Sequence, residues 1–179
     1  MKKYQHTLLF FAFGIAFVAF VLGFVFQQKN TEERIENEQI YKTTTVNIYF
    51  PNSKEDPGSL YCDHTYPSER EITSKNMINN GKTGELAYLA ISELLNGPTE
   101  SEKKAGFLTS LNTGIEVKEI SIINETATIN FNETLNKEVA GSCRALSIRS
   151  QIENTLKQFE EIKKVIILMD GIEEGILEP

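Results

Sequence analysis

The stretch GSCRALSIRSQIENTLKQFEEIKKVIILMDG, residues 141–171, places a predicted helix directly before a predicted strand. In its first half, apolar residues recur at helical spacing and fall within about 80° of one another around the helix axis. They are Ala145, Ile148, Ile152, Leu156 and Phe159. The second half contains VIILM at 165–169, a continuously apolar run that is typical of a strand covered on both faces or central in a sheet. Asp170-Gly171 predicts a turn after it.

A second helix is predicted earlier in the chain. Residues 84–96 carry apolar side chains at helical spacing, and Gly97-Pro98 ends the pattern. The residues that follow, Thr99 to Glu102, read T-E-S-E, which predicts a capping box for one more helical turn.

Short strands alternate with these helices. Apolar alternation predicts a strand at 46–50, and a further short strand is predicted at 69–73. Residues 115–131 predict a hairpin that turns at 124–125, with a bulge near 118–119 where the apolar phase slips. Because helices and strands are interleaved, we expect an α+β fold. It would be a single compact domain with a mixed β-sheet and two main helices packed on one face.

The N-terminal segment has a different character. Residues 8–26, LLFFAFGIAFVAFVLGFVF, are all apolar, glycine or alanine, and a helix of this length spans roughly 28 Å, close to the ~30 Å core of a bilayer. The run is longer than the ~7–15 residues of a signal-peptide core, and no A-x-A-like cleavage site follows it. A lipoprotein would carry a cysteine just after the run, but the first cysteine is Cys62. We therefore expect one uncleaved transmembrane signal anchor.

The basic residues that precede this segment predict its orientation. Lys2 and Lys3 precede it without any acidic residue, and such a basic excess stays in the cytoplasm. The expected order is a cytoplasmic N-terminus at 1–7, the anchor at 8–26, a polar linker at 27–44 and an extracytoplasmic domain at 45–179.

The part beyond the anchor is acidic. Setting Lys2 and Lys3 aside leaves 16 basic and 25 acidic residues, a formal charge of −9. Nucleic-acid binding requires a basic surface that neutralises phosphates, so this charge argues against a nucleic-acid partner. Solubility alone accounts for the acidic balance.

The two cysteines allow four interpretations. Cys143 follows the predicted start of a helix, and a thiol-dependent enzyme would pair it with His64 as a base. A metal site built from Cys62, His64 and Cys143 would have only three obvious ligands. Two free thiols are the third reading. A Cys62–Cys143 disulfide is favoured, because both cysteines lie in the part expected outside the cytoplasm. It requires Cα atoms within ~7 Å of each other.

An aromatic surface is a further candidate. Tyr49, Tyr61 and Tyr66 could form an exposed patch for a partner or a glycan, and ordinary partial burial is the alternative. We predict no catalytic constellation, metal or cofactor.

The order of five segments resembles the GerM-type domain, also called GerMN, of sporulation and germination proteins. They are VNIYF at 46–50, AISELLNGPTESEKKAGFLTSLN at 90–112, ATINFNETL at 127–135, GSCRALSIRSQIENTLKQF at 141–159 and VIILMDG at 165–171. The motif positions are Leu94, Leu95, Gly97, Pro98, Thr99, Gly141, Asn154, Thr155, Leu156, Phe159, Asp170 and Gly171. We expect the chain to differ from the founding type in having one such domain and a transmembrane anchor.

The resemblance implies an extracytoplasmic, membrane-tethered module of bacterial cell envelopes, similar in fold to ring-building motifs of secretion systems. It brings no catalytic residue set. The leading hypothesis is a single-pass protein of the cytoplasmic membrane whose outer domain binds another envelope protein or itself. The alternatives are a peptidoglycan- or carbohydrate-binding module and, more remotely, a thiol-dependent enzyme that uses Cys143.

Overall fold

A computed structural model describes residues 23–24, 42–58, 60–74 and 82–177. The chain divides into two compact units, Met1–Ile40 and Tyr41–Pro179, and the second is described below. Except for residues 23–24, the predicted anchor at 8–26 lies outside the described residues. Among the residues that are described, no helix has both the length and the apolar character that crossing a bilayer requires.

The second unit contains two sheets. The two-stranded antiparallel sheet consists of β1 (Lys42–Phe50) and β2 (Tyr66–Ser74). The other sheet has the order β3-β4-β5 and consists of β3 (Val117–Ile123), β4 (Thr126–Phe131) and β5 (Lys164–Met169). Since β1 begins at Lys42, the last three residues assigned to the linker 27–44 are strand.

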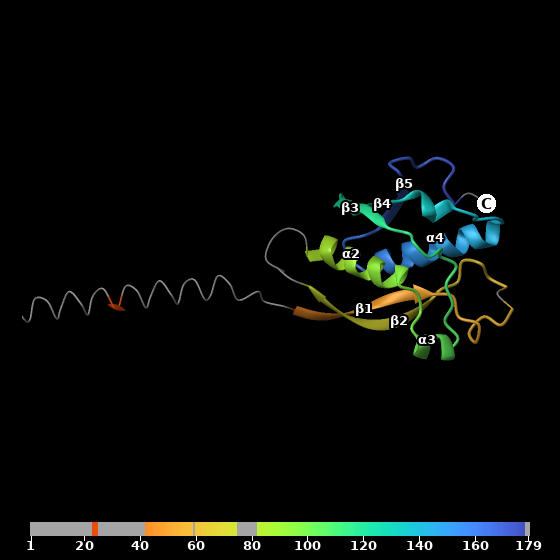
Figure 1. The fold of residues 1–179 in the computed structure, drawn as a ribbon, viewed down its shortest axis with the longest axis horizontal. Helices are drawn as coiled ribbons and strands as arrows, with labels where there is room; N and C mark the ends of the chain where they lie inside the picture. Colours follow the sequence, from red (N-terminus) through yellow and green to blue (C-terminus); the bar gives the residue numbers. More distant parts are fainter. Residues whose placement is uncertain (1–22, 25–41, 59, 75–81, 178–179) are drawn as a thin grey trace, which may run out of the picture. The chain divides into compact units, whose positions relative to one another are not determined.

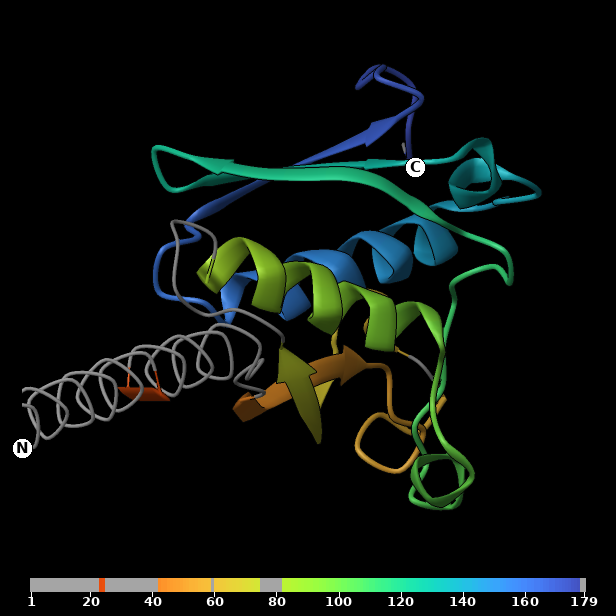
Figure 2. The same ribbon diagram turned by 60° about the vertical axis from the view of Figure 1, so that its left-hand side comes forward.

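Two long helices lie between the sheets. They are α2 (Lys82–Leu95) and α4 (Ser142–Lys157), and two shorter helical turns, α3 (Glu100–Lys104) and η1 (Glu133–Asn136), lie outside this layer. Figure 1 and Figure 2 show the β3-β4-β5 sheet on one side of the helices and β1-β2 on the other. The α+β class is confirmed, and the β3-β4-β5 sheet is mixed, with both helices on one of its faces. The expectation of a single sheet is wrong, because β1 and β2 form a second sheet on the other side of the helices.

The helices are covered on two sides because each sheet has one apolar face. On β1 the buried residues are Val46, Ile48 and Phe50, and on β4 they are Ala127, Ile129 and Phe131. The buried residues of α2 and α4 contact both sets and form one continuous core. Strict alternation along β1 and β4 therefore produces two half-buried sheets with the helices between them.

The hairpin prediction is confirmed in detail. β3 and β4 pair antiparallel, with the register shift between Val117 and Glu119. The turn residues Asn124 and Glu125 have φ of 48° and 61°, as a tight hairpin turn requires.

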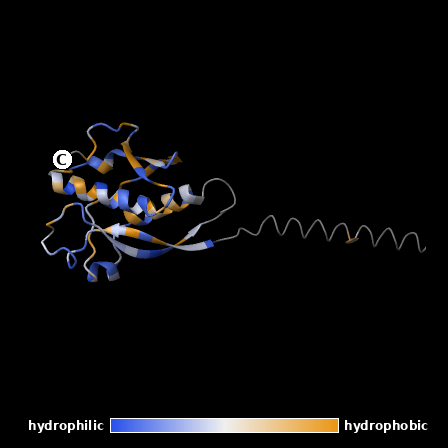
Figure 3. Cartoon of the chain, turned by 180° about the vertical axis from the view of Figure 1, so that it is seen from behind, coloured by the Kyte–Doolittle hydropathy of each residue, from blue (hydrophilic) through white to orange (hydrophobic). Residues whose placement is uncertain are grey.

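The expectation that the apolar run 165–169 is covered on both faces or central is wrong. Among the strands that the structure describes, β5 pairs with β4 alone, in parallel, and lies at the edge of its sheet. Val165 and Ile167 are buried against the helix layer, whereas Ile166 and Leu168 are half-buried on the outer face. Figure 3 shows β5 as hydrophobic along most of its length, unlike the more hydrophilic β2.

Candidate functional site

A disulfide joins Cys62, in the loop between β1 and β2, to Cys143 in the first turn of α4. The Cα atoms are 4.9 Å apart, within the limit set by disulfide geometry, and the bond closes a separation of 81 residues. With both sulfurs in this bond, Cys143 offers no thiolate to His64, so the structure does not form the pair that a thiol enzyme needs.

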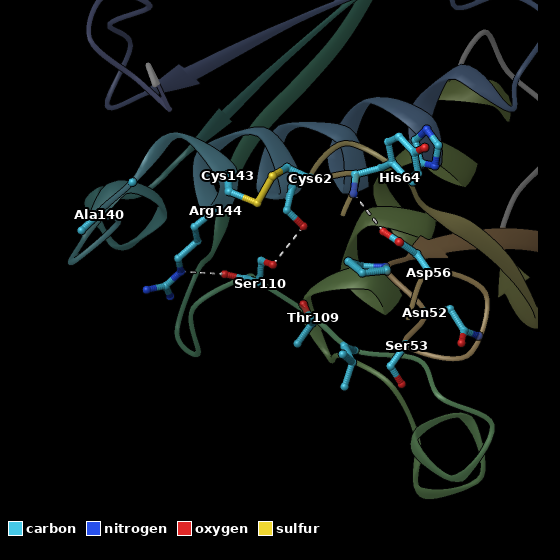
Figure 4. A pocket seen from close by; sticks show the side chains of 15 residues that line it. Asn52, Ser53, Asp56, Cys62, His64, Thr109, Ser110, Ala140, Cys143 and Arg144 are labelled. Carbon is cyan, nitrogen blue, oxygen red and sulfur yellow. Dashed lines mark hydrogen bonds between the residues drawn. A yellow bond between two sulfur atoms is a disulfide. The ribbon is translucent and has the colours of Figure 1, made fainter. Parts of the chain in front are cut away.

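A pocket of about 420 Å³ opens beside the disulfide. Figure 4 shows Asp56, His64, Thr109 and Arg144 around it. The Asp56 carboxylate accepts hydrogen bonds from the backbone N–H groups of Leu60 and Tyr61, which shapes the loop. Within the described residues, no group of three potential ligands could hold a metal ion.

Two polar side chains of the pocket, Arg144 and Thr109, bond to other parts of the domain. The Arg144 guanidinium donates to the backbone oxygens of Ser110 and Glu138 and to Oδ1 of Asn112. Thr109 Oγ1 donates to Gln151 Oε1 at 3.0 Å. These contacts hold α4 against the 109–112 segment, so Arg144 and Thr109 serve the packing of the domain.

The three tyrosines do not form one patch. Tyr66 pairs with Phe50 and Tyr49 pairs with Pro67, so the two neighbouring positions point to opposite faces of the β1-β2 sheet. Both are half-buried. Tyr61 is 58% exposed and stacks on His64, with ring centroids 4.4 Å apart. Only this pair forms an aromatic surface at the pocket.

A second polar cluster is centred on Arg70 of β2. Its side chain is 10% exposed and forms ion pairs with Glu102 at 2.6 Å and Glu93 at 2.9 Å. The guanidinium also donates to the carbonyl oxygens of Glu93 and Gly97, each at 2.8 Å. One arginine therefore joins β2, the end of α2 and the start of α3.

The contacts of Arg70 account for the glycine and the helix cap in the LLNGPT segment, residues 94–99. Gly97 has φ of 73°, a conformation that favours glycine, and its carbonyl faces Arg70. Thr99 Oγ1 accepts from the backbone N–H of Glu102, and the Glu102 carboxylate accepts from the backbone N–H of Thr99. The predicted capping box is therefore confirmed, and its glutamate is also the partner of Arg70.

The electrostatics follow from these contacts. Burial alone would raise the pKa of Glu102, but hydrogen bonds from Arg70, Ser68 and Thr99 outweigh it and lower the pKa to about 2. Burial likewise tends to lower the pKa of Arg70, while the carboxylates of Glu102 and Glu93 raise it above its usual value. The pair stays charged throughout the neutral range.

The NTLKQF segment at the end of α4 binds the free edge of β1. Gln158 Oε1 accepts from the backbone N–H of Asn47 at 2.8 Å, and its Nε2 donates to the carbonyl of the same residue at 2.7 Å. Thr155 Oγ1 accepts from the backbone N–H of Tyr49. The Gln158 amide thus takes the place of a neighbouring strand.

Comparison with known proteins identifies the family. The family model Germane, described as sporulation and spore germination, matches residues 47–175. The chain belongs to the Germane family. The predicted resemblance to the GerM-type domain is thereby confirmed. No curated protein matches the sequence.

The chain is also similar to solved structures. The tandem GerMN domains of the sporulation protein GerM from Bacillus subtilis match with a TM-score of 0.51 and 20% identity, over 73% of this chain and 40% of that chain. The first GerMN domain of the same protein matches with a TM-score of 0.48 and 20% identity, over 73% and 85%. A putative lipoprotein from Clostridium perfringens matches with a TM-score of 0.48 and 18% identity, over 76% and 80%.

The motif positions that carry the GerM-type resemblance are buried or half-buried, or lie at turns and helix ends. Leu94, Pro98, Thr155 and Leu156 are buried, while Leu95, Asn154 and Phe159 are half-buried. The remaining positions lie at turns and helix ends: Gly97, Thr99, Gly141, Asp170 and Gly171. Asp170 also forms an ion pair with Lys118.

Sequence reasoning missed Arg70, Glu93 and Gln158. Arg70 meets Glu102 across 32 residues, and no short-range pattern marks such a pair. Gln158 lies inside the NTLKQF segment, so its position was visible, but its role depends on the unpaired edge of β1.

Proposed function

We propose that this Germane protein is a membrane-anchored, extracytoplasmic interaction module without catalytic activity, which binds or scaffolds proteins of the bacterial envelope. The observation that carries the proposal is that three large polar side chains are bonded within the domain. Arg70, Arg144 and Gln158, which could otherwise contact a substrate, bond to other parts of the same domain. A domain built in this way offers surface and shape to a partner rather than reactive groups.

The anchor and orientation rest on sequence. Residues 8–26 are long and apolar enough to cross a bilayer, and Lys2 with Lys3 favours a cytoplasmic N-terminus. The cysteine pair supports the same orientation, since disulfides persist in oxidising compartments. The family supports an envelope role through its description as sporulation and spore germination.

Crosslinking in the native envelope tests this function. The full chain would be crosslinked in intact cells, purified under denaturing conditions, and its covalent partners identified by mass spectrometry. We expect one or more envelope proteins, or a second copy of the chain, to be captured in a manner that depends on residues 41–179. Recovery of cell-wall fragments alone, with no protein adduct, would contradict the proposal.

A peptidoglycan- or carbohydrate-binding module is the second candidate. The exposed Tyr61–His64 stack beside the pocket favours it, because aromatic faces are common binding surfaces for ligands with apolar faces. Sedimentation of the domain with isolated cell wall separates the candidates. Retention that is lost in Tyr61→Ala and kept in Tyr88→Ala, an exposed tyrosine on α2, would favour this second function.

A further inference from the structure

The outer edge of β5 has a definable set of free backbone groups. The backbone N–H of Lys164 donates to the Glu125 carbonyl, and that of Asp170 donates to the Phe131 carbonyl. The backbone N–H and C=O groups of even-numbered residues of β5 therefore point toward β4. Backbone groups of odd-numbered residues therefore point away from the sheet, because direction alternates along a strand. Met169 is already satisfied, since its N–H and C=O both bond to Ile172.

Two residues remain at this edge. Val165 and Ile167 present their backbone N–H and C=O groups outward, and no strand in the described ranges pairs with them. The β1 edge differs near its end, because Gln158 binds both backbone groups of Asn47 and Thr155 binds the N–H of Tyr49. Proteins commonly blunt an edge strand with charge, proline or a covering segment, yet the 165–169 stretch contains only apolar residues.

We propose that β5 pairs antiparallel with β5 of a second copy of this chain, with Val165 opposite Ile167 of the second copy and a two-fold axis at Ile166. This inference deepens the proposed interaction function by naming the surface and the partner. The two sheets then form one sheet in the order β3-β4-β5-β5-β4-β3. The contact is isologous, so it closes at a dimer.

The register follows from the free groups. When Val165 of each copy pairs with Ile167 of the other copy, every outward N–H and C=O group of these residues has a hydrogen-bond partner. A register centred on Ile167 would instead place Val165 opposite Met169, whose groups Ile172 already binds. The turn at Ile172 thus excludes the in-phase register centred on Ile167. The register centred on Val165 would place Ile167 opposite Lys163, whose N–H already donates to the Glu125 carbonyl.

The charges at the two ends of β5 are complementary. Lys163 and Lys164 precede the strand, whereas Glu173 and Glu174 follow it. All four are exposed, and among the described residues none of their side chains forms an ion pair. Antiparallel pairing brings the basic end of one copy to the acidic end of the other, which fixes orientation.

A single-cysteine experiment on the full chain in its membrane tests the pairing. In the proposed register Ile166 faces its own counterpart as a non-hydrogen-bonded pair, with Cα atoms about 4.5 Å apart. Ile166→Cys should therefore form a covalent dimer under mild oxidation, with the link between the two introduced thiols identified by mass spectrometry. The matched control is Leu168→Cys on the same face, whose counterpart would lie about 13 Å away along the strands. It should stay monomeric.

The charge complementarity gives a second test on the Ile166→Cys background. Lys163→Glu with Lys164→Glu should abolish the covalent dimer, and so should Glu173→Lys with Glu174→Lys. Coexpressing the two variants should restore a mixed dimer. Equal crosslinking at positions 166 and 168, or none at 166, would overturn the self-pairing. Capture of a different envelope protein together with no dimer would overturn this inference and leave the proposed interaction function standing.

Discussion

The two sheets of this protein treat their edges in opposite ways. At β1, Gln158 binds both backbone groups of Asn47 and Thr155 binds the N–H of Tyr49. Its partner β2 carries Arg70, and the loop between the two strands carries Cys62 of the disulfide. At β5, the outward groups of Val165 and Ile167 face no described strand. The β1-β2 sheet is held by contacts between residues far apart in the sequence, whereas the β5 edge has backbone groups free to pair with another strand. This difference indicates where the fold is held together and which edge we propose as the binding surface for a second copy.

The largest expected effect comes from removing the disulfide. Closing a loop of this size removes about 4–5 kcal/mol of unfolded-state freedom in the chain-entropy model, and removing a native disulfide from a small domain typically costs about 2–5 kcal/mol. Cys62→Ser and Cys143→Ser should each destabilise residues 41–179 by a similar amount, because either change breaks the same bond. Urea unfolding would measure this. The double variant should be no less stable than either single one, and an unchanged transition under reducing conditions would show that the bond contributes nothing.

Replacing Arg70 should have the next largest effect. Arg70→Met leaves the Glu102 carboxylate nearly buried without its main cation, a change that typically costs about 3–5 kcal/mol. Arg70→Lys should recover part of the loss, because an ammonium keeps the charge but not the fork of donors. The control is Lys103→Met, which removes an exposed ion pair with Glu100 and should leave the unfolding midpoint unchanged. If Arg70→Met were as stable as the control, the cluster would not hold this region together.

Acid should weaken the same cluster. The pKa of Glu102 falls from 4.5 in the unfolded chain to about 2 in the folded state, a difference on the order of 3 kcal/mol. Since the folded pKa is the lower one, this stabilisation is complete above pH 4.5 and is lost as the pH falls towards 2. Unfolding free energies measured across this range should show the loss, and Glu102→Gln should remove most of that pH dependence.

Opening the β1 edge should have a smaller effect. Gln158→Leu removes two hydrogen bonds to the backbone of Asn47 and should cost about 1–2 kcal/mol. The neighbouring exposed residue provides the control, because Lys157→Leu leaves the edge closed. If Gln158→Leu and Lys157→Leu unfolded at the same urea midpoint, Gln158 would not stabilise the β1 edge.

Much of the fold followed from local patterns. The 3.6-residue period identified α2 and α4, and the phase slip near Lys118 located the bulge of the β3-β4 hairpin. The strands β1 and β2 are longer than expected, because their ends carry threonine and charged residues rather than alternating apolar ones. Periodicity within each element shows which face is buried but not which element covers it, so the two-sheet arrangement was not predictable.

The site was predictable only in part. An even number of cysteines in a part of the chain expected outside the cytoplasm suggested the pairing of Cys62 and Cys143, which lie at bonding distance in the structure. The Arg70 cluster and the Gln158 contact depend on tertiary pairings over 23 to 111 residues, which leave no local signature. The apolar run of β5 was visible in the sequence, but its position at the edge came only from the sheet order.

The most direct test of the contrast between the two edges is residue-resolved amide hydrogen exchange of residues 41–179 over a range of protein concentrations. We predict that the amides of Asn47 and Tyr49 are protected at every concentration, because side chains of α4 bind them. The amides of Val165 and Ile167 should exchange readily in dilute protein and gain protection as the concentration rises. Protection of Val165 and Ile167 that is already complete in dilute protein, or that never changes with concentration, would contradict an open edge that binds a second copy.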